Sequence, residues 1–321
     1  MMRSLVLLAA VAAILLLLPQ VGSAYYITLM LPFFGYGVAL LGLNLLFGYT
    51  GLLSFGHALF VAIGAYTVAT ATSKLGLRSF ELILLISIAA AVVIAVPIGL
   101  LCVRYIKIFF GMLTLAFGML FHSFLFKFYD LTGGDQGMRV LRPSLLGIDF
   151  ANLDKTSFLV GPFYYFCLGL LVIGAALMWR IVHSPFGLHL RAIRDNPRKA
   201  EYLGVRVRRF RFYAFLISAA YGAVGGAILS VPVGLADPEL AYWTHSGNLV
   251  FMTVLGGFSH FFGPVLGALT FIFLQDQLMS LTQYWRFVLG VVLALIVILF
   301  PRGLMGLAEE LWRRLHPTRP S

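Results

Sequence analysis

The strongest constraint on this fold is a series of apolar runs, most of them long enough to cross a lipid bilayer. A bilayer core requires about 20 apolar residues per helix. The chain is 61% hydrophobic and 11% charged, whereas a soluble domain has about 25% charged residues. The candidate spans are 5–21, 25–47, 52–71, 80–101, 108–126, 160–182, 212–235, 247–258, 262–281 and 284–300. The sequence therefore predicts an all-α fold, a polytopic transmembrane helical bundle of about ten spans, some short or broken, forming a single transmembrane domain over 1–321.

Positive charge is concentrated in one loop between two apolar runs. Residues 189–211 contain 8 of the 23 Lys and Arg residues, and short loops rich in these residues stay cytoplasmic. We therefore expect the 184–211 loop and both termini to be cytoplasmic, and the long 127–159 loop to lie outside. On this interpretation the net charge of +11 reflects topology beside membrane lipid, and nucleic acid is not an expected partner.

The second half of the chain fits the same scheme, although one short loop does not. No Lys or Arg occurs between 212 and 284, and Asp237 and Glu239 lie in the connector after the seventh span, which we expect outside. Lys74 and Arg78 also fall outside, although loops that carry Lys and Arg usually stay cytoplasmic. The region after 247 has an uncertain number of spans, because three short crossings or one crossing with a re-entrant piece would both fit.

The first apolar segment resembles a secretory signal. Arg3 precedes an apolar run over 5–18, and the small residues Gly22-Ser23-Ala24 follow it. We expect a retained helix, because the next apolar run begins at once at Tyr25. The two cysteines lie within apolar runs without CxxC spacing and are expected to be small packing residues.

The charged loop contains signals for a short helix. Asn196 suits the N-cap and Gly204 suits the residue just past the end, so we expect a helix over 197–203. Ala200 and Leu203, three residues apart, would give it one small apolar edge. So short a helix is not stable alone in water. The loop therefore either serves topology alone or presents a docking helix to a cytoplasmic protein.

Several stretches resemble the permease subunits of ABC importers of the branched-chain amino acid type, the LivM kind. The similarity runs from about 35 to 307, and the motifs occur in the family's order. The similar stretches are SPFGLHLRAIRDNPRKAEYLGVRVRRFRFYAFLISAAYGAVGGAIL (184–228), NLLFGYTGLLSFGHALFVAIGAY (44–66), FFGMLTLAFG (109–118), LTGGDQGM (131–138), VLGGFSHFFGPVLGA (254–268) and FPRGLMG (300–306).

The resemblance implies that the 184–211 loop is a cytoplasmic coupling loop that docks on a separate ATPase. The docking motif of such importers resembles E-A-A followed by Gly, and the chain keeps the spacing from Ala200 to Gly204 but not the leading acid. The expected ATPase-coupling residues are Arg191, Arg194, Asp195, Asn196, Pro197, Lys199, Ala200, Glu201, Leu203 and Gly204. The implied assembly contains a sister permease, two ABC ATPase subunits and a soluble substrate-binding protein, in the bacterial cytoplasmic (inner) membrane.

The chain itself offers no site for ATP of the P-loop kind. That motif requires Gly-Lys before Ser or Thr, and none of the five lysines follows a glycine. We therefore expect no cofactor in this chain, with ATP and Mg held by the partner ATPase subunits. The resemblance implies a substrate among branched-chain or other small aliphatic amino acids, with urea or short-chain amides as the alternative.

Two glycine-rich segments are candidates for the substrate pathway. Glycines allow helices to pack closely and also permit broken helices that line a path. His57 and His260 each lie seven residues before a Gly-Ala pair, which suggests an internal repeat. The candidate residues are Gly48, Gly51, Ser54, Gly56, His57, Gly64, Gly256, Gly257, Ser259 and His260. For each histidine the alternative is a neutral side chain that ties two helices together.

Other classes of protein fit the sequence less well. An ion-coupled secondary transporter usually carries carboxylates within its spans, but nearly all 12 acids lie in loops or at span ends. An enzyme is not expected, because the chain has no HExxH, no GxSxG and no metal-spaced Cys or His set. The long 127–159 loop, with its glycine turn at 133–137, is either a surface for an external partner or a loose surface turn.

Overall fold

The architecture comes from a computed structural model that describes residue 19 and residues 23–106, 108–150, 152–300 and 302–315, with the backbone alone at 308 and 311–315. The chain forms a helical bundle with one pair of two-residue strands. The predicted first span, 5–21, lies almost entirely outside the described residues. The elements are α2 (Ala24–Asn44), η1 (Leu45–Tyr49), α3 (Ala58–Ser73), α4 (Phe80–Cys102), α5 (Ile108–Lys127), α6 (Tyr129–Thr132), η2 (Gly134–Gln136), β1 (Met138–Arg139), α7 (Lys155–Phe158), η3 (Leu159–Phe163), α8 (Tyr164–Val182), α9 (Pro185–Asp195), α10 (Pro197–Tyr202), α11 (Val207–Val233), β2 (Leu235–Ala236), η4 (Pro238–Ala241), α12 (Trp243–Gly256), α13 (Gly263–Leu281), α14 (Trp285–Leu299) and α15 (Gly303–Leu315).

The all-α bundle is confirmed, with fewer full-length spans than the ten predicted. Among the described residues, six helical segments are long and apolar enough to cross a membrane. They are Ala24–Tyr49, Phe80–Cys102, Ile108–Lys127, Lys155–Val182, Val207–Val233 and Gly263–Leu281. α3 and α14 are shorter apolar helices. α12 has 14 residues, about 21 Å at 1.5 Å per residue, so it is shorter than the roughly 30 Å bilayer core. The prediction that some helices are short or broken is therefore confirmed.

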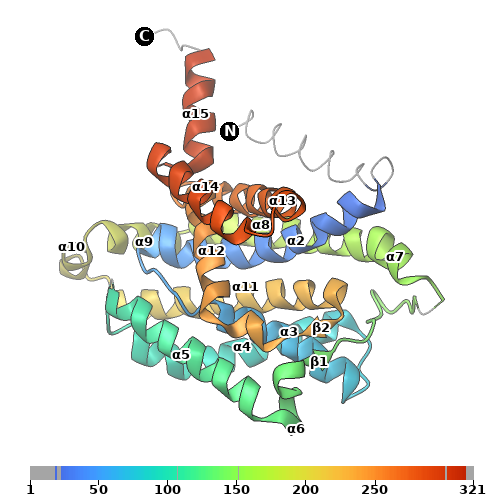
Figure 1. Cartoon of the computed structure of the whole chain (residues 1–321). Helices are drawn as coiled ribbons and strands as arrows, with labels where there is room; N and C mark the ends of the chain where they lie inside the picture. Colours follow the sequence, from blue (N-terminus) through green and yellow to red (C-terminus); the bar gives the residue numbers. More distant parts are fainter. Residues whose placement is uncertain (1–18, 20–22, 107, 151, 301, 316–321) are drawn as a thin grey trace.

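α11 lies at the centre of the bundle, between α2 and α3 (Figure 1). Glycines make this possible, because a Cβ at Gly64 would lie 1.9 Å from the Ala223 carbonyl oxygen, and one at Gly226 would lie 1.8 Å from that of Val61. The backbones of α3 and α11 are thus in direct contact, as small residues permit in membrane helices.

The loops gather at two opposite ends of the bundle. α9 and α10 lie at one end of Figure 1, here called the α10 end, whereas β1, β2 and α7 lie toward the other, the β1 end. Met138 of β1 pairs with Ala236 of β2. The 127–159 loop and the connector after α11 therefore share one end, opposite the 184–211 loop, as predicted from charge. Which end faces the cytoplasm remains a prediction.

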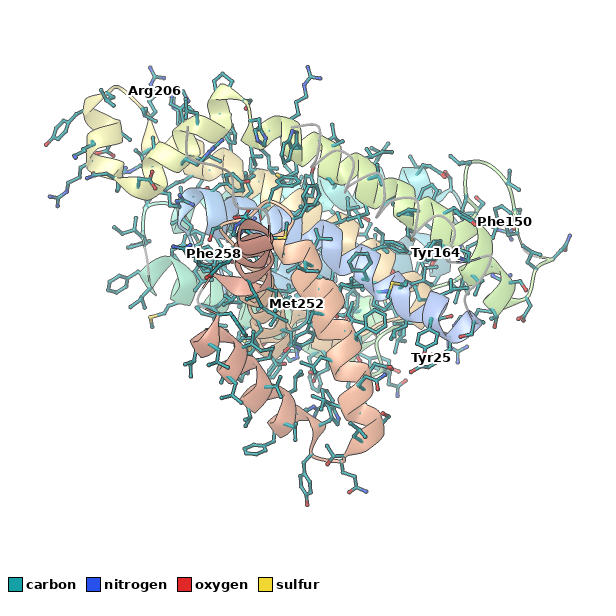
Figure 2. All side chains as sticks on the ribbon, turned by 90° about the horizontal axis from the view of Figure 1, so that it is seen from above. Tyr25, Phe150, Tyr164, Arg206, Met252 and Phe258 are labelled. Carbon is teal, nitrogen blue, oxygen red and sulfur yellow. The ribbon has the colours of Figure 1, made fainter. Side chains whose placement is uncertain are left out.

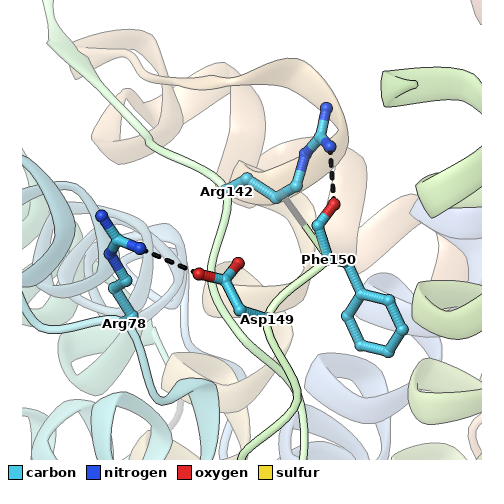
Figure 3. Close-up of polar contacts among 4 residues, drawn as sticks. All are labelled: Arg78, Arg142, Asp149 and Phe150. Atoms are coloured by element: carbon cyan, nitrogen blue, oxygen red, sulfur yellow. Dashed lines mark hydrogen bonds and ion pairs between the residues drawn. The ribbon is translucent and has the colours of Figure 1, made fainter. Parts of the chain in front are cut away.

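Side-chain contacts hold the described part of the 127–159 loop, which argues against a loose surface turn. Arg78 forms an ion pair with Asp149 at 2.9 Å, and Arg142 donates to the Phe150 carbonyl at 3.1 Å (Figure 3). Lys74 donates to two further carbonyls of this loop at 2.8 and 3.0 Å. Lys74 and Arg78, the two residues that break the charge rule, are thus bound to the loop at the β1 end.

Four helices follow position 242 in the described part of the chain. Three of them, α12, α13 and α14, coincide with the three crossings considered above, and how many of them cross the membrane remains a prediction. α12 leads the chain back from the β1 end, α13 and α14 form a hairpin, and α15 begins beside the end of α12. Non-helical chain separates consecutive helices at the two glycine-rich segments, over 51–57 and 257–262. Both cysteines are buried and free, as expected of packing residues.

Candidate functional site

The 184–211 loop folds into two helices before α11 begins at Val207, and only the second of the two was predicted. α10 (Pro197–Tyr202) matches the expected helix over 197–203, and the Asn196 side chain caps it by accepting from the backbone N–H of Lys199 at 3.0 Å. α9 was missed, although Ser184-Pro185 is a typical helix start. The loop is therefore a helix pair joined at one residue.

The end of α10 confirms the role predicted for Gly204. This residue has φ +83°, a left-handed conformation that favours glycine. Its N–H donates to the Glu201 carbonyl at 2.9 Å, and that of Val205 donates to the Ala200 carbonyl at 3.0 Å. These two bonds form a Schellman motif, so both ends of α10 are fixed by local hydrogen bonds.

The predicted apolar edge of α10 is wrong. Ala200 is 2% exposed and packs with Ile193 and Val207 inside the loop. Leu203 is 83% exposed, beside Tyr202 at 89%. The three-residue spacing fails because Leu203 lies past the last helical residue, where the chain turns away. Ala200 thus holds the helix pair together, and Tyr202 and Leu203 form the exposed apolar tip, here called the α10 tip.

The other predicted coupling residues are exposed or partly exposed. The exposed ones are Arg194, Asp195, Asn196, Lys199, Glu201, Leu203 and Gly204, and Arg191 and Pro197 are partly exposed. Arg191 and Arg194 also contact the bundle through their guanidinium groups, as described below. An open groove of about 440 Å³ lies beside the tip, lined among others by Leu203, Arg206 and Arg209. Figure 2 shows Arg206 at this far end and Phe150 at the opposite one.

Two arginines of α9 contact the place where α2 loses its helical form. The guanidinium of Arg194 donates through Nη1 to the Gly48 carbonyl. That of Arg191 lies 5.8 Å from the centre of the Tyr49 ring and donates to the Val182 carbonyl at 2.8 Å. The predicted coupling residues and pathway residues therefore meet at Gly48, which sequence reasoning did not foresee.

The two glycine-rich segments also meet there. A Cβ at Gly48 would lie 2.3 Å from the Phe258 carbonyl oxygen, and the rings of Phe47 and Phe258 are 4.5 Å apart. Asn44 donates through Nδ2 to the His260 carbonyl at 3.3 Å. Asn44, Phe47 and Phe258 were missed, because partners more than 200 residues apart leave no local signal.

Three other predicted pathway glycines lie where backbones approach closely. A Cβ at Gly56 would lie 1.8 Å from the Thr114 carbonyl oxygen, and a Cβ at Gly256 would lie 1.7 Å from the Gly263 carbonyl oxygen. Gly64 packs against α11 in the same way. Packing accounts for these three. By contrast, Gly51 and Gly257 have φ of +74° and +102°, so they supply backbone conformations at the two helix breaks. The internal repeat remains a prediction.

The two candidate histidines differ in their surroundings. His57 is fully buried beside Gly222 and Phe60, and neither ring nitrogen has a hydrogen-bond partner among the described residues. The suggestion that it ties two helices together by hydrogen bonds therefore finds no support. Ser54 is likewise buried without such a partner, whereas Ser259 is exposed. His260 lies 3.3 Å from Glu309 of α15.

Comparison with known proteins gives consistent results. A family model described as "Branched-chain amino acid transport system / permease component" matches residues 25–297. The high-affinity branched-chain amino acid transport system permease protein LivM of Escherichia coli K12 is 27% identical over 84% of this chain and 67% of its own length. LivH of the same organism is 25% identical over 85% and 92%. The autoinducer 2 import system permease protein LsrC of Klebsiella pneumoniae is 30% identical over 50% and 48%.

No solved structure matches the chain. The family model nevertheless covers most of the chain, including both glycine-rich segments and the α9–α10 pair. The apolar helices identify a multi-pass membrane protein. The relatives are transport permeases. The chain therefore belongs to the family of permease components of branched-chain amino acid transport systems.

Proposed function

We propose that this chain is a permease subunit of an ATP-binding cassette importer in the bacterial inner membrane, driven by two separate ATPase subunits. A sister permease and a soluble binding protein would complete the assembly. The observation that carries the proposal is the α10 tip, where Tyr202 and Leu203 are 89% and 83% exposed. Large apolar side chains at the end of a helix capped at both ends are typical of a surface that a partner covers.

The internal packing of the α9–α10 pair supports a docking role over a purely topological one. Scattered arginines would be enough to set topology, but this loop also has a capped helix and its own buried cluster of Ile193, Ala200 and Val207. Such a unit can move as one body. ATP and Mg on the partner subunits would drive that movement, and the permease would change between two states of different substrate affinity.

We infer that substrate passes close to the two glycine-rich segments, 48–57 and 256–260. Both interrupt helices inside the bundle, and broken helices in transporters are typical of binding regions. The buried, unpartnered polar groups of Ser54 and His57 lie in the first segment. Polar groups of this kind are expected to find partners in water, substrate or a second conformation.

Small branched-chain amino acids are the proposed substrates, since the LivM and LivH relatives are described for them. LsrC is described for autoinducer 2 import, so the substrate varies among relatives, and urea or short-chain amides remain the alternative. Thermal-shift measurements on the cognate binding protein would decide, with leucine, isoleucine, valine, urea and acetamide as ligands. Stabilisation by urea or acetamide alone would overturn the amino-acid assignment.

Docking is tested by Leu203→Asp in the chain coexpressed with its sister permease and ATPase subunits. A charge at this exposed position leaves the fold intact but must be desolvated when a partner covers it. We expect about a tenfold loss of copurifying ATPase, equivalent to roughly 1.4 kcal/mol, and a similar loss of uptake. Leu146→Asp is the matched control, because Leu146 is 75% exposed on the loop at the β1 end. Equal ATPase recovery from both variants would refute docking at the α10 tip.

An ion-coupled carrier is distinguished by uptake in ATP-loaded vesicles with and without an ionophore. An ATP-driven importer continues when the ion gradient collapses. Uptake that stops with the ionophore while ATP is still present would contradict the proposed energy source.

A further inference from the structure

The chain between α2 and α3 is the least regular part of the bundle. α2 widens into the π-helical turn η1 over Leu45–Tyr49, and residues 51–57 are not helical before α3 begins at Ala58. Thr50 donates its hydroxyl hydrogen to the Leu45 carbonyl at 2.7 Å, and Gly51 has φ +74°. π-helical turns are rare and frequently occur at functional sites. This segment, 45–57, is here called the α2 break.

A helix end leaves carbonyl groups without helical partners, and the Gly48 carbonyl is one that α9 reaches. Arg194 donates to it through Nη1, and a Cβ at Gly51 would lie 3.0 Å from the Arg194 Cγ. The arginine therefore contacts the α2 break with both its charge and its aliphatic stem. A cation at the negative end of a helix is also favoured electrostatically.

Arg191 reinforces this contact from the same side of α9. Residues three apart on a helix share a face, and the Arg191 guanidinium lies 5.8 Å from the centre of the Tyr49 ring. Its Nη2 also donates to the Val182 carbonyl, at 2.8 Å, which ties it to the end of α8. Two cationic side chains of the coupling loop thus hold consecutive residues of the α2 break.

The opposite side of the α2 break contacts the second glycine-rich segment. Gly48 leaves no space for a side chain against the Phe258 carbonyl, and the Phe47 ring lies tilted against the Phe258 ring, with the ring centres 4.5 Å apart. His260 accepts a hydrogen bond from Asn44 through its carbonyl and pairs with Glu309 through its ring. A continuous set of contacts therefore runs from α9, through the α2 break, to 257–260 and α15.

We propose that Arg194 is a positioning residue that ties the α9–α10 pair to the α2 break, so that docking-driven movement is passed to both glycine-rich segments together. This inference rests on the proposed function, because it assumes that a partner moves α10. It gives Arg194, whose side chain is still 37% exposed and also donates to Asp195 at 3.3 Å, the role of a link to the bundle in place of the predicted ATPase contact. Without the link, α10 still binds its partner, but the broken helices no longer follow it.

The test compares Arg194→Gln with Arg198→Gln, which removes the same charge from an exposed position on α10. Both are measured in the full complex, reconstituted with binding protein, for ATPase recovery, ATP hydrolysis and uptake. We expect Arg194→Gln to keep recovery and hydrolysis within about twofold of the wild type while uptake per ATP falls at least tenfold. Arg198→Gln should keep its uptake per ATP. Arg194→Lys, which retains a charged donor, should restore at least half of the wild-type uptake per ATP.

Each other outcome has a defined meaning. Unchanged uptake per ATP in Arg194→Gln would overturn the inference and leave docking untouched. Loss of ATPase recovery in Arg194→Gln would make the residue a docking contact, which also overturns it. The docking proposal is tested separately, because it fails if Leu203→Asp recovers a normal amount of ATPase.

A second measurement does not depend on how well an Arg194 variant folds. Spin labels at Arg198→Cys and Ser259→Cys, both exposed positions, report the distance between α10 and the second glycine-rich segment. With Arg194 present, that distance should change by less than half a helical turn, about 2.7 Å, between the nucleotide-free and the nucleotide-trapped complex. A larger change would show that the two segments move independently and would refute the link.

Discussion

Replacing Gly64 by alanine tests the contact at the centre of the bundle. The added Cβ would lie 1.9 Å from the Ala223 carbonyl oxygen, whereas ordinary contact begins at 3.4 Å, so α3 and α11 must separate by roughly 1.5 Å or bend. The opposing backbone cannot rotate away as a side chain can. Overpacking typically costs about 1–3 kcal/mol, and alanine returns roughly 0.5–1 kcal/mol of helix propensity. We expect a net destabilisation of about 1–2 kcal/mol.

The matched control is Gly169→Ala in α8, where a Cβ would have nothing within 4 Å. This variant should be neutral or more stable by up to about 1 kcal/mol. The two proteins are compared by SDS titration in mixed micelles, with tryptophan fluorescence reporting the fraction unfolded. We expect the free energy of unfolding to differ by about 2 kcal/mol. If Gly64→Ala were as stable as Gly169→Ala, the backbone contact between α3 and α11 would be refuted.

Two further predictions concern the loops at either end. Asn196→Ala removes the side-chain cap that accepts from the Lys199 N–H, so the stability of α10 should fall by about 1 kcal/mol. Amide exchange over 197–203 should then be about fivefold faster in a hydrogen-exchange experiment, and unaltered exchange would contradict the cap. Arg78→Ala breaks the ion pair with Asp149, in which the Arg78 side chain is 72% exposed and the Asp149 side chain 51% exposed. The free energy of unfolding, measured by thermal denaturation, should therefore change by less than about 1 kcal/mol. A larger loss of stability would contradict the solvent exposure of this pair.

Local signals in the sequence predicted the features that depend on neighbouring residues. The apolar runs predicted the long helices, and the distribution of Lys and Arg placed the 184–211 loop opposite the 127–159 loop. Asn196 and Gly204 predicted both ends of α10, because caps and left-handed turns depend on residues within one helical turn. The same reasoning missed α9, whose Ser-Pro start was available.

Local reasoning failed where a side chain's direction depends on distant partners. Ala200 and Leu203 have the right spacing for one edge, but Leu203 lies beyond the helix and Ala200 is drawn inward by Ile193 and Val207. Arg194 carries the charge expected of a coupling residue, yet it binds Gly48, 146 residues earlier in the chain. Spacing describes a helix face but not what packs against that face.

The sequence alone determined that this protein is a helical membrane bundle with one capped, basic loop, since apolar length, charge and capping act over a few residues. Only the tertiary structure decided which glycines pack, which shape helix breaks and which arginines contact the bundle. These outcomes depend on backbones from distant segments approaching within contact distance. At Gly48, segments around residues 48, 194 and 258 meet, and no local pattern in any of them specifies the other two.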